Sequence, residues 1–473
     1  MARNIGGADD HGSAPDQTSF VVRARHVLTC GPAGHIRDGA VAVAGGKIQA
    51  VAPYEDIRRS YPETTVMGDG TGIVSPGLIS CHGHFSEGLV SGIGETHTLW
   101  EWFEHVVGPI EPFLTYEMAV VGTLLKGAEM AQSGVTTVGD MFCHAPGAVP
   151  STPGVVKALD RLGLRGDVSF GPSSDPNPRP LDVIVAEHGA LADAAASSRR
   201  SRFRVGIATV PSSSDELIQI SVKLAADVGR LHIHLHEARE EVTHSRSTRG
   251  LAPIAYAARA GLLDAQVVAA HCVWVDEEDM RLLKEHDVAV AHNPVSNMIL
   301  ASGVCPVPRL RHEGISVGLG VDGAASNDSQ NMLETMKMAA LLQKLHHQQA
   351  TALTAPDVLS MATLGSATAL GVDDEVGSLE PGKWADLVLF NEQSSSMANI
   401  HDPYQKVVYC ASTRDVQDVW VAGERVVLDG HVVGVDMPEL LPHARELAAR
   451  LATDAGLDSE LAAPERRGTA FQR

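Results

Sequence analysis

Two histidines separated by one residue, His82 and His84, follow an apolar segment at residues 73–81 that Pro76 and Gly77 interrupt. We expect this segment to be a strand whose end presents both imidazoles on one face, because side chains at positions i and i+2 of a strand point to the same side. Two neutral imidazoles so placed can hold one divalent metal ion of borderline softness. The spacing therefore predicts half of a metal site.

An apolar run that ends in a metal-binding or acid–base side chain returns three times further along the chain. These runs end at His234, His271 and Asp322. A structural core histidine would explain any one instance, but four instances at strand ends favour a shared site. His82, His84, His234 and Asp322 offer three nitrogens and one oxygen, which leaves room for water on a catalytic metal ion.

A hydrolytic site also needs groups that move protons, and three residues are suited to this role. Glu237 follows His234 by three residues, just beyond the expected strand end, where a carboxylate can act as acid and base. His271 is expected to hold and polarise a nucleophile formed from metal-bound water. Asp322 is expected to coordinate the ion and to accept or pass a proton.

Three other histidines, His232, His236 and His292, leave alternatives open. His232 shares a strand face with His234, and both His232 and His236 compete with it for the ligand position. The spacing to Glu237 favours His234, which leaves packing or hydrogen bonding to the other two. The sequence assigns no role to His292.

The centre of the chain, residues 75–382, alternates apolar strands with amphipathic helices. Strands are expected near residues 135–140, 204–208, 267–271, 288–292 and 315–319, and helices near 115–133, 214–228 and 276–285. This alternation predicts a TIM-type (β/α)8 barrel, in which active-site groups lie at the carboxyl ends of the strands. A doubly wound sheet is the alternative, but the chain lacks a glycine-rich nucleotide fingerprint after its first strand.

Short strands separated by glycine turns flank this centre on both sides, at residues 20–51 and 385–428. They predict a small β-sandwich built from both chain ends, which makes the protein an α/β protein overall. The expected division is residues 1–74 for the N-terminal part of the sandwich, 75–382 for the barrel and 383–435 for the C-terminal part of the sandwich. Residues 436–473 are expected to form a helix near 444–455 and then polar coil.

The composition limits the kinds of partner. Lys and Arg number 37 and Asp and Glu 58, so the formal net charge of −21 argues against a nucleic-acid-binding surface. Six dispersed cysteines without a C-x-x-C pair favour a reducing compartment. Residues 1–19 are polar, unlike a signal peptide, and no segment approaches the length of a membrane span. We expect a cytoplasmic protein that binds a small molecule.

Six motifs, taken together and in this order, resemble the amidohydrolase superfamily. They are Ser75-Pro76-Gly77-Leu78-Ile79 with His82-Gly83-His84, His234-Leu235-His236-Glu237, Ala270-His271-Cys272-Val273, Ala291-His292-Asn293-Pro294-Val295-Ser296-Asn297, Val321-Asp322-Gly323-Ala324-Ala325-Ser326-Asn327-Asp328 and Gly377-Ser378-Leu379-Glu380-Pro381-Gly382-Lys383-Trp384-Ala385-Asp386-Leu387. The resemblance is greatest to the branch of S-adenosylhomocysteine and methylthioadenosine deaminases, s-triazine chlorohydrolases and related aminohydrolases. It covers nearly the whole chain.

The resemblance implies a site for one metal ion, a proton shuttle and a residue that orients the hydroxide. These roles fall on His82, His84, His234 and Asp322 as ligands, Glu237 as shuttle and His271 as the orienting residue. Zinc is the favoured ion, with iron and manganese as alternatives, and a dimer or larger homo-oligomer is the expected assembly.

A binuclear branch of the same superfamily uses a carbamylated lysine at the end of a middle strand. In this chain the candidate lysines, Lys126, Lys157 and Lys223, fall within helical patterns instead. One metal ion is therefore favoured over two.

Two further matches concern the substrate. The resemblance implies that Trp102 lines a base pocket and that Glu111 holds ribose hydroxyls, with His271 also facing the substrate. The implied reaction is hydrolytic deamination of a purine nucleoside of the adenosine, methylthioadenosine or adenosylhomocysteine type.

The chain departs from the adenosylhomocysteine-acting relatives in two places. Residues 208–213 replace a segment in which those relatives carry a histidine that contacts the nucleoside, and Phe170 or its neighbours replace an arginine that binds the amino-acid tail. A smaller ligand is therefore an alternative: a pterin, an oxidised purine, an s-triazine (including dechlorination) or a cyclic amide. A non-catalytic scaffold is the remaining alternative, and retention of all the ligands disfavours it.

Overall fold

The barrel strands are short and largely apolar, as strands buried on both faces require. They are β6 (Leu78–Ser80), β8 (Val135–Phe142), β9 (Arg165–Phe170), β10 (Ser201–Thr209), β11 (Arg230–Leu235), β12 (Gln266–His271), β13 (Ala289–His292) and β14 (Val317–Leu319). They pair in parallel in this chain order. The Cys81 N–H, just after β6, donates to the Leu319 carbonyl of β14 over 2.9 Å, so the first and last strands of the sheet are joined. The computed structural model, which describes residues 19–457, thus confirms the TIM-type barrel.

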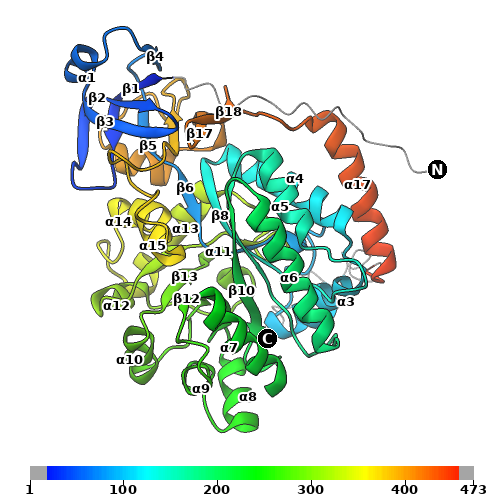
Figure 1. The fold of residues 1–473 in the computed structure, drawn as a ribbon. Helices are drawn as coiled ribbons and strands as arrows, with labels where there is room; N and C mark the ends of the chain where they lie inside the picture. Colours follow the sequence, from blue (N-terminus) through cyan, green and yellow to red (C-terminus); the bar gives the residue numbers. More distant parts are fainter. Residues whose placement is uncertain (1–18, 458–473) are drawn as a thin grey trace, which may run out of the picture.

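Helices between the strands cover the outside of the barrel (Figure 1). The main ones are α4 (Tyr116–Gln132), α5 (Pro153–Leu162), α6 (Leu181–Ser197), α7 (Asp215–Val228), α8 (Arg239–Arg249), α9 (Pro253–Ala260), α10 (Glu277–Glu285), α11 (Pro294–Ile299), α12 (Val307–His312), α13 (Met332–His347), α14 (Ala355–Ser360) and α15 (Ser366–Leu370). Side-chain caps fix several starts; Ser214, for example, accepts a hydrogen bond from the Leu217 N–H at the start of α7. Their apolar faces and the strands share one large core.

A second layer of strands, drawn in blue and orange in Figure 1, forms the sandwich beside the barrel. Its sheet runs in the order β19-β18-β17-β16-β5-β1-β2-β3, with β4 paired to β1. Both chain ends contribute: β1 (Phe20–Leu28), β2 (His35–Ala44), β3 (Lys47–Pro53), β4 (Thr65–Met67) and β5 (Ile73–Pro76) from one, and β16 (Leu387–Phe390), β17 (Val416–Val421), β18 (Glu424–Leu428) and β19 (His431–Val432) from the other. Trp420 is fully buried in the separate core of this domain.

Gly77 takes the chain from the sandwich into the barrel. It lies between β5 and β6, where an added Cβ would come within 2.1 Å of the Thr136 hydroxyl on the next barrel strand. Only glycine allows so close an approach. The expected division at residues 74, 382 and 435 stays a prediction, and β5 extends across the first of these positions.

His82 and His84 do not lie on one strand, so that expectation is wrong. The barrel strand ends at Ser80, His82 lies in the following turn, and His84 ends a separate short strand, β7 (Gly83–His84). Strand β7 pairs in parallel with β15 (Asp322–Gly323), which itself lies beyond β14. The turn rotates the two imidazoles to an interplanar angle of 87° with centroids 4.7 Å apart. Both rings still face one point.

A series of short helices between residues 99 and 113 lies over the carboxyl ends of the strands. It comprises α2 (Leu99–Trp102), a π-helical turn (Phe103–Val107), α3 (Gly108–Ile110) and a 3-10 turn (Glu111–Phe113). The Trp102 indole N–H donates to the Ala325 carbonyl over 3.0 Å and ties this segment to the loop after β15.

The C-terminal helix α17 (Met437–Asp454) begins earlier than the expected residue 444. Asp436 caps the helix and Pro438 lies in its first turn, where proline is tolerated, whereas Pro442 lies inside the helix. The polar coil expected after it, and residues 1–18, lie outside the described residues. Among the described helices, none has the length and apolar character needed to span a bilayer.

Candidate active site

Strained backbone marks the ends of the strands that carry the predicted site. His271, Asp322 and His236 adopt positive φ angles of 75°, 67° and 55°, a conformation that favours glycine. Such strain persists only where the surrounding structure holds it, and it is concentrated at functional sites. These positions are therefore candidates for residues whose side chains must point in one direction.

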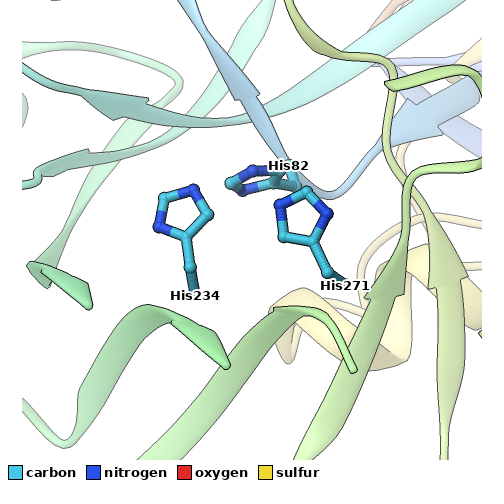
Figure 2. Close-up of side chains that lie close together, drawn as sticks. All are labelled: His82, His234 and His271. Atoms are coloured by element: carbon cyan, nitrogen blue, oxygen red, sulfur yellow. The ribbon is translucent and has the colours of Figure 1, made fainter. Parts of the chain in front are cut away.

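Two of the predicted ligands, His84 and His234, carry their ring protons away from a common centre. Nδ1 of His84 lies 2.6 Å from the Met141 carbonyl and Nδ1 of His234 lies 2.8 Å from the Ala208 carbonyl. Because a carbonyl oxygen only accepts hydrogen bonds, both Nδ1 atoms carry the proton. Nε2 of each ring therefore faces inward with a free lone pair. Figure 2 shows the rings of His82, His234 and His271 facing one another from separate elements.

These lone pairs demand a positive charge between them. Nε2 of His84 and Nε2 of His234 lie 3.1 Å apart, and neither carries a proton to share. Nε2 of His82 is fully buried and has no hydrogen-bond partner among the described residues. Buried acceptors left unpaired are unfavourable unless a proton or a cation satisfies them. The donor set, three imidazole nitrogens and a carboxylate, fits a divalent ion such as zinc.

Asp322 brings the negative charge to this cluster. Its Oδ1 lies 3.3 Å from Nε2 of His82 and 3.4 Å from Nε2 of His84. Burial opposes ionisation, but the surrounding imidazoles, His82 first among them, outweigh it and hold the pKa of Asp322 well below its ordinary value. Burial, and then His82, lower the pKa of His84 to about 4, so this ring is neutral at pH 7, as a ligand must be.

His271 presents the opposite ring tautomer. The Asn297 side-chain amide donates to its Nδ1 over 2.9 Å, so its Nε2 carries the proton. That Nε2 lies 3.4 Å from the Glu237 carboxylate and 3.7 Å from Oδ2 of Asp322. His271 is thus a donor that points into the site, a geometry suited to orienting a water or a substrate oxygen. Sequence reasoning placed Asn297 in a motif but gave it no role.

Glu237 lies at the same centre, 5% exposed. Burial, and then the charge of Asp322, raise its pKa well above the ordinary value, while the Ser302 hydroxyl donates to its Oε1 over 3.4 Å. A carboxyl group whose pKa is raised in a cleft is suited to giving and taking protons.

The predicted substrate residues line one cavity of about 730 Å³ together with the cluster. Trp102 is buried there, and Glu111 is 8% exposed, with Oε2 accepting from the Asn177 amide over 3.0 Å. Burial raises the pKa of Glu111 to about 7. The structure therefore brings together His84, His234, His271, Asp322, Glu237, Trp102 and Glu111 around the same space.

Two buried groups beside the cluster were not assigned a catalytic or metal-holding role from the sequence, where His232 was expected only to pack or to form a hydrogen bond. Nδ1 of His82 donates to Nε2 of His232 over 2.8 Å, and Nδ1 of His232 lies 3.3 Å from the Ser169 hydroxyl. That hydroxyl donates to the Asp140 carbonyl over 2.8 Å. This relay fixes the His82 tautomer, which leaves Nε2 of His82 aimed at the centre.

The second missed group is Glu87, three residues after His84. Its Oε2 accepts from the Ala325 N–H over 2.9 Å, and it lines the cavity. Burial, and then Asp322, raise its pKa well above the ordinary value. An acidic residue so soon after the paired histidines was the available signal.

The other histidines lie outside the cluster. His236 donates from Nδ1 to the Trp274 carbonyl over 2.9 Å and accepts at Nε2 from the Ile254 N–H over 3.2 Å, so it joins neighbouring segments. His292 is buried without a hydrogen bond to any described residue. Phe170 is fully buried and does not line the cavity, whereas Thr209 does.

The fold and this geometry agree with the family comparison. A model of the amidohydrolase family matches residues 73–426, and one of the imidazolonepropionase-like composite domain of bacteria matches residues 39–63. The chain belongs to the amidohydrolase family. It is a metal-dependent hydrolase of the aminohydrolase class, acting on carbon–nitrogen bonds other than peptide bonds.

Two similar proteins are named as deaminases. A 5-methylthioadenosine/S-adenosylhomocysteine deaminase from Desulforudis audaxviator is 37% identical over 91% of this chain and 99% of its own. A 5'-deoxyadenosine deaminase from Methanothermobacter thermautotrophicus is 35% identical over 92% and 99%.

Two solved structures of zinc-containing proteins share this fold. An adenosine deaminase from Xanthomonas campestris with bound zinc has a TM-score of 0.84 at 29% identity, covering 93% of this chain and 100% of the other. The atrazine chlorohydrolase TrzN from Arthrobacter aurescens, complexed with zinc, has a TM-score of 0.83 at 27% identity, covering 91% and 100%.

Proposed function

We propose that this protein is a zinc-dependent deaminase of adenosine-type purine nucleosides. The observation that carries the proposal is the pair of inward-facing, unprotonated Nε2 atoms of His84 and His234, 3.1 Å apart, in the same cavity as Trp102 and Glu111. Relatives named as deaminases of methylthioadenosine, adenosylhomocysteine and 5'-deoxyadenosine support the substrate class.

His82, His84, His234 and Asp322 are the residues that would hold the ion. Zinc is favoured by this nitrogen-rich donor set and by the zinc bound in the adenosine deaminase of similar fold. When bound, such an ion lowers the pKa of a water ligand and so supplies a nucleophile near neutral pH.

Proton transfer is assigned to Glu237. A raised pKa allows it to give a proton to the ring nitrogen next to the carbon that carries the amine. It then takes the proton that remains on the attacking oxygen and passes it to the departing nitrogen, a task that Asp322 can share. Ammonia leaves and the ring carbon keeps the oxygen.

Substrate orientation is assigned to the remaining residues. The Nε2–H of His271 directs the attacking oxygen toward the ring carbon. The Trp102 ring forms a wall for the base, and the Glu111 carboxylate accepts hydrogen bonds from ribose hydroxyls. These contacts distinguish a nucleoside from a free base.

A screen for ammonia release tests the proposal. The purified protein, with zinc restored, is assayed on adenosine, 5'-methylthioadenosine, 5'-deoxyadenosine, adenine, guanine, a pterin and an aminotriazine, with chloride release followed on a chlorotriazine. We expect the adenine nucleosides to give the highest kcat/KM. Highest activity on a pterin or a triazine, or chloride release in place of ammonia, would contradict the nucleoside assignment.

A further inference from the structure

Apart from histidines, the ionisable side chains on the cavity wall are mostly acidic. Of the described residues that line it, seven are acidic and none is a lysine or an arginine. The acidic ones are Glu87, Glu104, Glu111, Asp175, Glu237, Glu240 and Asp322. The net charge of −21 on the whole chain adds to the same negative potential.

These acidic side chains fall into an inner set and an outer set. Glu87, Glu111, Glu237 and Asp322 are buried beside the imidazole cluster or the ribose position. Glu104, Asp175 and Glu240 are exposed and come from three separate segments: the π-helical turn, the loop after β9 and helix α8. We call these three residues the acidic rim.

The nearest cationic side chains do not offset the rim. Arg179 is close enough to Glu111 to lower its pKa slightly, but it does not line the cavity. Arg239 precedes Glu240 on α8, yet its guanidinium lies over the Trp274 ring, 4.3 Å from the centroid. Apart from the imidazole of His244 on α8, the described residues that line the outer cavity therefore offer an anion no basic side chain.

Apolar side chains line the same cavity as the acidic rim. Trp100, Phe103, Leu300 and Pro211 line the cavity, and Trp100 is 37% exposed. An apolar wall favours an uncharged substituent because burying it removes apolar surface from water. A carboxylate or a phosphate placed there would lose hydration and gain no partner.

The orientation of the substrate determines which of its ends meets the acidic rim. The carbon that loses its amine must reach the cluster at the inner end, so the opposite end of a nucleoside, its 5' position, points toward the rim. On the basis of the function proposed above, we infer that the cavity selects substrates by charge. It accepts an adenosine-type nucleoside with an uncharged or cationic 5' substituent and discriminates against one with a carboxylate or a phosphate.

A matched pair of substrates tests the inference: adenosine 5'-carboxamide and adenosine 5'-carboxylate, which differ in charge and hardly in shape. We expect kcat/KM for the carboxamide to exceed that for the carboxylate about tenfold. Each of the three rim charges, acting through water, should lower kcat/KM for the carboxylate roughly twofold. The ratio should shrink toward one between roughly 10 mM and 1 M salt, as screening shortens from about 30 Å to about 3 Å. 5'-Amino-5'-deoxyadenosine, a cation, should show the opposite salt dependence.

Charge-removing variants test whether the acidic rim causes the preference for the carboxamide. The triple variant Glu104→Gln, Asp175→Asn, Glu240→Gln should reduce the carboxamide-to-carboxylate ratio several-fold at low salt. The control, Glu55→Gln, Glu63→Gln, Asp374→Asn, removes three exposed charges that do not line the cavity and should keep the ratio.

Three outcomes separate this inference from the function on which it rests. Turnover of adenosine together with a ratio near one at low salt overturns the charge selection alone. An equal loss of the ratio in both triple variants also overturns it, because the rim would then have no special role. Absence of turnover with adenosine itself overturns the proposed function, and the charge selection falls with it.

Discussion

Both ends of the barrel bury a carboxylate among basic side chains, yet only the carboxyl-terminal end turns several unprotonated ring nitrogens toward one point. At the amino-terminal end, Asp167 on β9 faces Arg202 and the fully buried Arg204 on β10. At the carboxyl-terminal end, Asp322 faces His82 and His84. Both carboxylates are almost completely buried, and their basic neighbours lower the pKa of each.

The amino-terminal pair is complete in itself. Arg204 is fully buried and makes five hydrogen bonds, two to Asp167 and three to the carbonyls of Leu231, Gln266 and Leu370. A guanidinium has five N–H donors, so none is left over. Such a pair holds strands together and has no capacity for a ligand.

The carboxyl-terminal cluster is incomplete in itself. Two inward Nε2 atoms lie within 3.1 Å of each other without a proton, and Nε2 of His82 has no partner in the described chain. The difference teaches that burial and charge alone do not mark a functional site. Several lone pairs that converge on one point, left over after all local hydrogen bonds are counted, do mark it.

The largest expected effect is on turnover. Glu237→Gln keeps the size of the side chain but cannot shuttle a proton, so we expect kcat on adenosine to fall by about 10²–10⁴-fold. Zinc content, measured by mass spectrometry, should stay at one ion per chain. Glu216→Gln, an exposed residue on α7, serves as the matched control. Activity of the Glu237→Gln enzyme near the wild-type level would remove the shuttle role.

The next effect is on folding at the other end of the barrel. Asp167→Asn leaves Arg204 buried without a counter-charge, which should lower the free energy of unfolding by about 3–5 kcal/mol in urea titrations. Replacing both residues by leucine should recover much of this loss, while zinc binding is kept. Loss of zinc from the double variant would mean that the two ends are not independent.

A smaller effect is expected on metal affinity. His232→Phe fills the same space but cannot accept the Nδ1–H of His82, so we expect zinc affinity to fall about 10–100-fold in a chelator competition. His232→Gln, which can accept that hydrogen bond, should recover part of it. Equal affinities in the two variants would show that His232 acts only by packing.

The smallest effect concerns Glu111 and pH. Glu111→Gln should lower kcat/KM about tenfold for adenosine and leave adenine unchanged, since only the nucleoside has ribose hydroxyls. Burial raises the pKa of Glu111 to about 7, so its carboxylate forms as the pH rises through 7. The adenosine profile should therefore rise through this pH and flatten in the variant. If kcat/KM for adenine rose in the same way through pH 7, a group other than Glu111 would be responsible for the rise.

Much of the fold followed from local patterns. The alternation of apolar strands and helices gave the barrel, and glycine-separated strands at both ends gave the sandwich, because each depends on periodicity within a few residues. The same periodicity misled at His82 and His84, where the strand breaks after Ser80. A two-residue period in the sequence indicates which side chains share one face of a strand, but it does not indicate where the hydrogen bonding of that strand ends.

The contacts that complete the site could not be read locally. His82 meets His232, and His84 meets His234, across 150 residues in each case. Likewise, the tautomers of His234 and His271 are set by a distant carbonyl and a distant amide. Only folding brings these partners together, so the sequence predicted which residue types would meet but not which ring nitrogens would remain free.

The central claim is that His82, His84, His234 and Asp322 share one divalent ion. Crystals of the zinc-restored protein, with anomalous diffraction recorded on both sides of the zinc absorption edge, test it directly. We expect one anomalous peak per chain at this cluster, about 2.0–2.2 Å from each ligand atom. A fully active crystal with no peak there, or with its only peak elsewhere, would contradict it.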